Sequence, residues 1–224
     1  MKIICLTQRP IQTLILIYLL GSKNIFFDHI FYTPLRKKNL LGFKDEGTYS
    51  WKALKYQCKL LNISFDKIVN INSKKSLKIL KKISPDCMIS LVVDTIFNKN
   101  IISVFKKGIY SSHGGIMPKY RGNECSKWAV LNNEKFVGIS LQKINKGIDT
   151  GRIVKVSKLP TKIFKNVKDI DKKLYYQFKL NDFVEIIQKL KTNKKIKFIK
   201  NKKIGKQYFE MHKDLEKIVL QKLK

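Results

Sequence analysis

The sequence is poor in cysteine, in acidic residues, in arginine and in long apolar runs. Its only cysteines, Cys5, Cys58, Cys87 and Cys125, lie far apart, and no two of them form a Cys-x-x-Cys pair. This spacing argues against a disulfide scaffold and against a structural zinc site, and a reducing cytoplasm is the expected location. No cluster of His, Cys, Asp and Glu indicates a metal ion, so we expect none.

The one conspicuous apolar run, residues 11–20, is too short to cross a membrane, which takes about 20 residues. It resembles the apolar part of a signal peptide, but the polar Gly21-Ser22-Lys23-Asn24 follows it without a small-x-small cleavage site. We therefore expect a buried helix here and no association with a membrane. The hydrophobic fraction of 44% also excludes a disordered chain.

Positive charge is abundant, with 47 Lys and Arg against 16 Asp and Glu and a formal net charge of +31. Only Arg9, Arg36, Arg121 and Arg152 are arginines, although phosphate and base recognition usually draws on the planar arginine fork. Two interpretations stay open. Abundant Lys, Ile and Asn are typical of an AT-rich genome, which we favour, and a surface that binds a polyanion such as RNA is the alternative. The densest block, residues 189–206, holds nine lysines and no acid.

Short apolar segments alternate with amphipathic ones, which predicts an α/β fold: a doubly wound, mostly parallel Rossmann-like sheet. We expect strands at 2–6, 28–32, 67–71 and 86–93, and helices at 11–20, 50–61 and after Asn72 or Ser73. The character changes near Leu159, which predicts a main domain over 1–159 and an extension over 160–224. The extension reads as a helix over 167–190, a hairpin within 195–209 and a helix over 214–223.

Residues 108–156 hold the residues best suited to chemistry. His113 precedes Gly114 and Gly115, and Asp149 lies between Gly147 and Gly151, where the backbone can turn sharply. A carboxylate beside an imidazole favours the cationic ring, which can donate a proton or stabilise an oxyanion. The alternative is that both are ordinary turn residues.

The order of several short motifs resembles the folate-dependent formyltransferase family, which includes methionyl-tRNA, glycinamide ribonucleotide and nucleotide-sugar formyltransferases. The matching stretches are Ser111-Ser112-His113, Ile116-Met117-Pro118-Lys119-Tyr120-Arg121-Gly122, Trp128-Ala129-Val130 and Gly147-Ile148-Asp149-Thr150-Gly151, with Gly138-Ile139-Ser140 in place of the family's Gly-Val-Thr strand. The resemblance implies transfer of a formyl group from 10-formyltetrahydrofolate to a primary amine through a tetrahedral intermediate, in a catalytic domain over 1–159.

Carried over by resemblance, His113 is the cationic donor and Asp149 its partner, which accepts a proton through water. Ser111 stands where the family has an Asn, and a hydroxyl offers one donor on a short arm in place of two on a longer one. Loss of an oxyanion donor typically costs about 10²–10³ in rate. The resemblance further implies a folate site at Asp94, Thr95, Ile96, Asn145, Gly147 and Ile148, and an acceptor pocket at Tyr120, Arg121 and Glu124.

The segments on either side of these motifs narrow the choice of the amine that accepts the formyl group. Thr7-Gln8-Arg9-Pro10 follows the first strand without the glycine-rich loop that glycinamide ribonucleotide enzymes use for phosphate. The extension differs from the barrel domain of methionyl-tRNA enzymes. We favour a small amine on a nucleotide-linked amino sugar, in a protein that can form a homodimer. The alternatives are a methionyl-tRNA enzyme with a reduced C-terminal region, a glycinamide ribonucleotide enzyme and a non-catalytic basic module that binds RNA.

Overall fold

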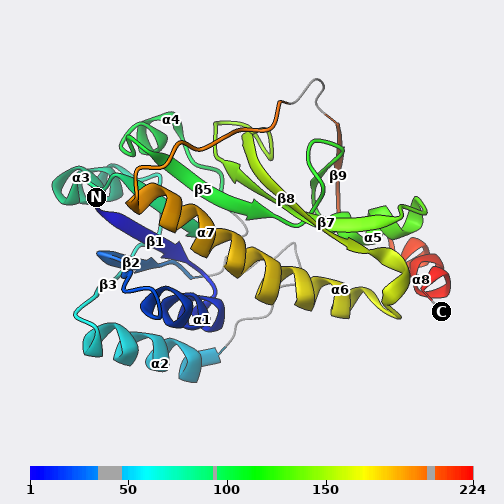
Figure 1. Cartoon of the computed structure of the whole chain (residues 1–224), viewed down its shortest axis with the longest axis horizontal. Coiled ribbons are helices and arrows are strands. Elements are labelled where there is room, and N and C mark those ends of the chain that lie inside the picture. The colour runs from blue at the N-terminus through cyan, green and yellow to red at the C-terminus, as the bar shows by residue number, and fades with distance from the viewer. Residues whose placement is uncertain (35–46, 93–94, 201–204, 224) are drawn as a thin grey trace.

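The computed structural model describes residues 1–34, 47–92, 95–200 and 205–223. Its centre is a seven-stranded sheet in the order β3-β2-β1-β4-β5-β7-β8 (Figure 1). The first five strands in this order pair in parallel, and β7 pairs antiparallel with both β5 and β8. The predicted doubly wound, mostly parallel sheet is confirmed. Its strands are β1 (Ile3–Thr7), β2 (His29–Tyr32), β3 (Ser64–Lys67), β4 (Cys87–Leu91), β5 (Gly108–His113), β7 (Phe136–Lys143) and β8 (Arg152–Pro160).

Helices cover both faces of this sheet, because β1 is buried on both sides. Ile3 and Cys5 pack toward one face and Ile4 and Leu6 toward the other, because successive strand residues point to opposite sides. The first face is covered by α1 (Pro10–Gly21), α2 (Gly47–Leu60) and α7 (Lys179–Lys191), and the second by α3 (Lys74–Ile83) and α4 (Lys99–Ile102). A central strand with both faces covered is apolar throughout, and all five residues of β1 and of β4 are buried.

A second, smaller core lies at the other end of the molecule. It is built by α5 (Cys125–Leu131), α6 (Val167–Lys173), α8 (Lys213–Lys222) and the short strands β6 (Tyr120–Gly122) and β9 (Lys206–Tyr208). The 3₁₀ turn η1 (Thr161–Ile163) precedes α6, and a π-helical turn, η2 (Leu174–Phe178), connects α6 with α7. In Figure 1, α6, η2 and α7 run as one rod across the front of the molecule.

Two local predictions are wrong. In place of a hairpin within 195–209, β9 pairs in parallel with β6, with Arg121 opposite Gln207. The strand expected over 67–71 ends at Lys67, and the buried Ile68 and Ile71 belong to the turn before α3 instead. The division of the chain near residue 159 stays a prediction, although α7 packs its buried face onto the main sheet.

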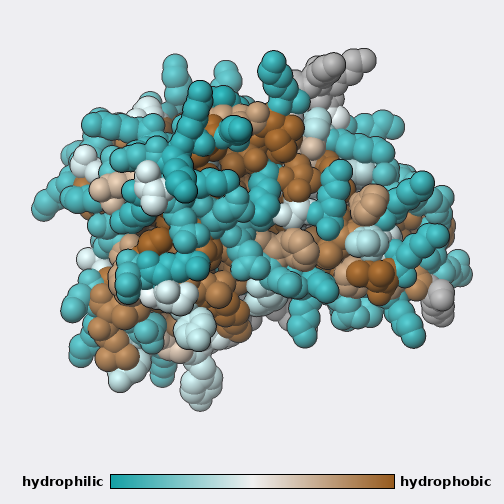
Figure 2. All heavy atoms as spheres, viewed as in Figure 1, coloured by the Kyte–Doolittle hydropathy of each residue, from teal (hydrophilic) through white to brown (hydrophobic). Residues whose placement is uncertain are grey.

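The apolar run over 11–20 is part of α1, which packs against α7 and α2. No helix in the described part of the chain has the length and hydropathy needed to cross a membrane. All four cysteines are buried and free. Hydrophilic side chains cover most of the face shown in Figure 2, with hydrophobic ones in patches between them.

Candidate active site

Two adjacent strands place the polar side chains of the site on one face of the sheet. Ser111 and His113 are two residues apart on β5 and therefore point to the same side. The antiparallel partner β7 sets Gln142 opposite Ser111 and Ser140 opposite His113. Ser140 Oγ donates to the carbonyl of Gly115 at 2.7 Å and accepts from Met117 N at 2.9 Å, so this strand also fixes the loop after His113.

The imidazole of His113 faces an acceptor at each ring nitrogen. Its Nδ1 lies 3.3 Å from Asp149 Oδ2, and its Nε2 lies 3.0 Å from the carbonyl oxygen of Tyr120. The side chains of His113 and Asp149 are only 8% and 18% exposed. A carbonyl and an ionised carboxylate can only accept hydrogen bonds, so the arrangement is fully satisfied by the doubly protonated, cationic ring. The predicted approach of these two side chains is thus present in the structure.

Asp149 is held in place by three further features. Its Oδ2 accepts from Gly122 N at 3.0 Å, and its Oδ1 accepts from Gln142 Nε2 at 3.0 Å. Its φ of 47° is in the left-handed region, which non-glycine residues rarely adopt and which Asp tolerates better than most. Gln142 is itself anchored, because its Oε1 accepts from Gly151 N at 3.0 Å. The carboxylate therefore has both oxygens bonded and its backbone turned toward His113.

A free thiol completes the surroundings of the imidazole. Cys125 Sγ lies 3.5 Å from His113 Nε2, so Cys125, His113 and Asp149 form a line that resembles a nucleophile, a base and an orienting acid. Burial, and then the negative charge of Asp149, raises the pKa of the Cys125 thiol to about 12. A thiol with such a pKa stays protonated at neutral pH and is a poor nucleophile. Cys125 is therefore best described as a residue that packs beside the imidazole.

The three residues predicted to bind the acceptor amine lie in different surroundings. Tyr120 is 2% exposed and stacks on Tyr208, with its hydroxyl donating to Glu134 Oε1 at 2.8 Å. Glu124 contacts Lys127 and accepts from Met211 N at 2.6 Å, which ties α5 to the segment before α8. Arg121 Nε is buried without a hydrogen-bond partner in the described chain. Their part in binding an acceptor stays a prediction, and Arg121 has the most unused hydrogen-bonding capacity.

The predicted folate residues lie in two loops. Thr95 and Ile96 follow β4, and Ile96 is 56% exposed. Asp94 lies outside the described residues. In the loop after β7, Asn145 Oδ1 accepts from Gly147 N at 3.0 Å and from Thr150 Oγ1 at 2.8 Å, which shapes the turn before Asp149. Ile148 in that turn is 43% exposed. The structure brings Asp149 of this turn to His113, while Ser111 Oγ makes no hydrogen bond among the described residues.

Two residues of the site were not predicted. Gln142 could have been found from the alternation of side chains along a strand, because residues 138, 140 and 142 then point to the same face. The second is Tyr175, whose hydroxyl occupies the space above Gly114, next to His113. Its position depends on the π-helical turn η2, a feature that often occurs at functional sites and that has no simple sequence signal.

Comparisons with known proteins identify the family of the chain. The family model described as formyl transferase matches residues 66–210. The bifunctional polymyxin resistance protein ArnA of Wigglesworthia glossinidia brevipalpis is 33% identical over 126 residues, which cover 55% of this chain and 19% of that protein. The methionyl-tRNA formyltransferase of Finegoldia magna is 30% identical over 116 residues, which cover 52% of this chain and 37% of that enzyme.

A solved structure shares the fold over nearly the whole chain. The N-formyltransferase from Helicobacter canadensis, solved in complex with folinic acid and dTDP-3-aminofucose, superposes with a TM-score of 0.63 at 23% identity. The match covers 92% of this chain and 70% of that one. The chain thus matches less than half of the length of each of the two curated relatives. The family model, in contrast, matches well over half of this chain. The chain belongs to the formyl transferase family.

Proposed function

We propose that this protein transfers a formyl group from 10-formyltetrahydrofolate to a primary amine, and that the amine is carried by a nucleotide-linked amino sugar. The contact between His113 and Asp149 is the observation that carries the proposal. Formyl transfer creates a negative charge on the former carbonyl oxygen as the amine adds, and a nearby cationic imidazole stabilises that charge.

His113 acts as the donor to this oxygen. One of its ring donors stays on Asp149, and the other faces the neutral carbonyl of Tyr120. An oxyanion is a stronger acceptor than a neutral carbonyl, so the hydrogen bond donated by His113 Nε2 can shift from the Tyr120 carbonyl to a reacting oxygen beside it while Nδ1 stays on Asp149. Asp149 holds the ring at Nδ1 and takes up, through water, the proton that the attacking amine must lose. As the intermediate collapses and its bond to the folate breaks, that proton would pass to N10 of the departing tetrahydrofolate.

Ser111 supplies at most one hydroxyl donor at the position of the family's Asn. It shares its face of β5 with His113, and its hydroxyl has no hydrogen bond among the described residues. The hydroxyl is therefore available to the same oxygen as the imidazole, on a shorter arm than an amide.

The exposed residues of the two loops fit a folate. Ile96 and Ile148 present apolar side chains to solvent, as residues that cover a flat heterocycle would, and Gly147 leaves its backbone accessible. When bound, 10-formyltetrahydrofolate would supply the activated formyl carbon. The Helicobacter enzyme was solved with folinic acid and an amino sugar nucleotide together, which supports this combination of ligands for the present chain.

The test measures transfer of an isotopically labelled formyl group from 10-formyltetrahydrofolate to a panel of amines. The panel contains dTDP-3-aminofucose and related nucleotide-linked amino sugars, methionyl-tRNA and glycinamide ribonucleotide. We expect label in an amino sugar nucleotide. Substitution His113→Asn should lower this rate by roughly 10²–10³-fold, since it removes the charged donor.

The matched control is His212→Asn, because the His212 side chain is 76% exposed and Asn retains the ability to cap α8. The control should keep full activity, and both variants should keep the thermal stability of the unsubstituted protein. An equal rate for His113→Asn and the unsubstituted protein would remove His113 from the mechanism.

Methionyl-tRNA is the second candidate acceptor. It is favoured by the net charge of +31 and by the curated relatives, among which methionyl-tRNA formyltransferases recur. Label in methionyl-tRNA and none in the amino sugars would select it. Binding of RNA with a steep salt dependence, and no transfer to any amine, would instead support a non-catalytic basic module.

A further inference from the structure

A cavity opens at the end of the sheet away from His113. It has a volume of about 270 Å³, close to the lower end of the range of roughly 300–1,000 Å³ for small-molecule sites. Its walls come from the segment before β5, the end of β7, the end of α7 and the chain that follows α7. Tyr110, which lines it, is three residues from His113 on β5 and points to the opposite face, so the two sites are separate.

Three lysines from three different segments meet at this cavity: Lys107, Lys143 and Lys194. No acidic residue is among its lining residues. Lys119, Lys127, Lys155, Lys189 and Lys217 all pair with carboxylates elsewhere in the fold. Among the residues that the structure describes, the three cavity lysines have no carboxylate partner, and Lys107 Nζ donates to the neutral amide oxygen of Asn193 at 2.6 Å.

Lys143 is held over the cavity by the backbone beneath it. Its aliphatic stem crosses Gly108, where any added Cβ would collide with Lys143 Cε, and the φ of +99° at Gly108 also requires glycine. Burial, together with the positive charge of Arg152, lowers the pKa of Lys143. A cation placed near another cation and partly out of water is stabilised by a bound anion.

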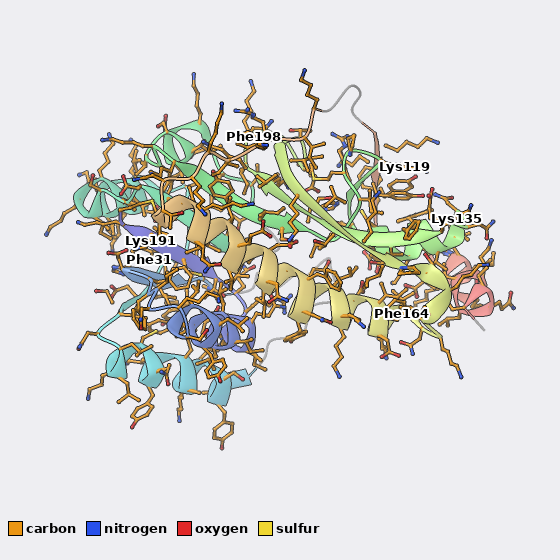
Figure 3. All side chains as sticks on the ribbon, viewed as in Figure 1. Phe31, Lys119, Lys135, Phe164, Lys191 and Phe198 are labelled. Carbon is orange, nitrogen blue, oxygen red and sulfur yellow. The ribbon has the colours of Figure 1, made fainter. Side chains whose placement is uncertain are left out.

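The remaining wall is apolar and partly aromatic. Tyr110, Leu190, Ile196 and Phe198 supply it, and the guanidinium of Arg152 lies 3.7 Å from the centroid of the Phe198 ring. Phe198 is labelled in Figure 3, beside β8 and above the sheet. A small cavity lined by both cations and an aromatic ring is complementary to a ligand with a phosphate and a flat ring.

We propose that this cavity binds a small organic phosphate with an aromatic ring, of the class of the nucleoside monophosphates. The phosphate contacts Lys107, Lys143 and Lys194, and the ring packs against the partly exposed Ile196 and Phe198, since Tyr110 is only 1% exposed at the base of the cavity. The volume admits one nucleotide-sized ligand, which favours a mononucleotide over a continuous RNA strand. Binding here is independent of formyl transfer, so it can be measured without an activity assay.

The first experiment locates the ligand by NMR of the full chain with labelled isoleucine methyl groups. Ile196 lines the cavity and Ile148 lies in the loop that carries Asp149, so each methyl reports one site. Titration with UMP or AMP should shift Ile196. Both nucleotides should bind about 10-fold or more tightly than ribose 5-phosphate and inorganic phosphate, because a stacked base adds to the phosphate contacts. A shift at Ile148 alone, or equal affinity for all four probes, would overturn the proposal.

The second experiment tests the lysines. The double substitution Lys143→Met and Lys194→Met keeps the aliphatic stems and removes two charges, and it should weaken UMP binding by roughly 10-fold or more. Lys195→Met is the matched control, since Lys195 is exposed, directly follows Lys194 and does not line the cavity. Equal weakening by the control would show a general charge effect and contradict a built site. An oligouridylate that binds far more tightly than UMP, with a steep salt dependence, would assign the surface to RNA instead.

Discussion

At the level of single residues, the site depends on how the Asp149 carboxylate is oriented. Its Oδ2 accepts a hydrogen bond from Gly122 N, and its Oδ1 accepts one from Gln142 Nε2. These two hydrogen bonds fix the rotation of the carboxylate, and in that orientation Oδ2 contacts His113 Nδ1. Gln142 is 5% exposed and uses both ends of its amide, on Asp149 and on Gly151 N. A buried amide engaged at both ends holds its neighbours and does not reach the substrate, so Gln142 is a positioning residue.

Substitution Gln142→Met keeps the length of the side chain and removes both hydrogen bonds. A hydrogen bond to a charged group contributes about 1.5–3 kcal/mol, so kcat for formyl transfer should fall by roughly 10–100-fold. KM for the folate should change little, because Gln142 lies beneath the Asp149 turn and is buried. The measurement is a kcat and KM comparison together with a pH profile of kcat, since a displaced Asp149 would alter the protonation behaviour of the site.

Gln221→Met is the control for this substitution, because Gln221 is an exposed residue of α8. It should leave kcat, KM and the pH profile unchanged. A Gln142→Met variant with unchanged kcat and pH profile would show that Gly122 N alone suffices to orient Asp149.

The sequence predicted the approach of His113 and Asp149 but not the residues that hold them in place. His113 and Asp149 could be found because a glycine-rich context and a family motif mark both. Gln142 lies in a strand that resembles any other buried strand, and its partner is set by the register of β5 and β7. Such long-range register is decided by the packing of whole strands and is not encoded in the few residues around one position.

At the level of elements, one continuous helical rod connects the main core with the candidate active site. Helix α7 packs Phe183 and Ile187 onto the sheet, and α6 packs Ile170 into the smaller core. Between them, the π-helical turn η2 directs Tyr175 over Gly114. The C-terminal part of the chain is therefore a wall of the site, in addition to any role in assembly.

Substitution Gly114→Ala tests this contact. An added Cβ would lie 2.9 Å from Tyr175 Cζ and would overlap the hydroxyl, whereas Gly114 has an ordinary backbone conformation that Ala can adopt. Overpacking of this kind typically costs about 1–3 kcal/mol, so we expect a lower free energy of unfolding and a lower rate of formyl transfer. The measurement is chemical denaturation of Gly114→Ala, alone and combined with Tyr175→Leu.

The combined variant separates this clash from other effects. In the Tyr175→Leu background the side chain is shorter, so Gly114→Ala should cost less than half of what it costs alone. Gly21→Ala is the control, because its nearest neighbour to an added Cβ is Phe26 Cε1 at an ordinary 3.7 Å and α1 favours Ala over Gly. Equal costs with and without the Tyr175 ring would contradict the assigned contact.

Elements with strong apolar patterns were predictable, and short or edge elements were not. The buried runs of β1 and β4 and the Ser73 cap of α3 mark their elements locally. The edge strand β3 has no fully buried residue, so the apolar pattern shifted the expected strand to the following residues. The pairing of β6 with β9 joins segments more than 80 residues apart, and the sequence of neither contains that information.

At the level of the whole molecule, the few acidic residues are used to join elements. Glu216 binds Lys127 and so connects α8 with α5, where Glu124 binds the same lysine. Asp182 and Glu185 both bind Lys155 and connect α7 with β8. In a chain with a net charge of +31, each such carboxylate also reduces repulsion between lysines. Stability should therefore depend on pH through a small number of carboxyl groups.

Asp171 on α6 lowers the free energy of unfolding as the pH rises, whereas a carboxyl group that pairs with a lysine raises it. Burial is the main cause that raises its pKa from 3.8 to about 6, and the charge of Glu124 acts in the same direction, while Ser126 and Lys127 oppose the rise. The folded state then holds this proton more tightly than the unfolded state. The contribution of Asp171 to the free energy of unfolding is thus greatest below pH 4, falls as the pH rises from about 4 to 6, and is constant above that.

Substitution Asp171→Asn should remove this loss, so the variant should gain stability relative to the unsubstituted protein as the pH rises from 4 to 7. A shift of two pKa units corresponds to about 3 kcal/mol, and partial exposure reduces the expected gain to roughly 1–2 kcal/mol. The measurement is urea denaturation across that pH range, with the exposed Asp169→Asn on the same helix as the control.

Because burial also raises the pKa of Asp182, part of the decline should persist in the variant. A difference between Asp171→Asn and the unsubstituted protein that does not change with pH would mean that Asp171 is ionised in the folded protein throughout, and that Ser126 and Lys127 outweigh its burial.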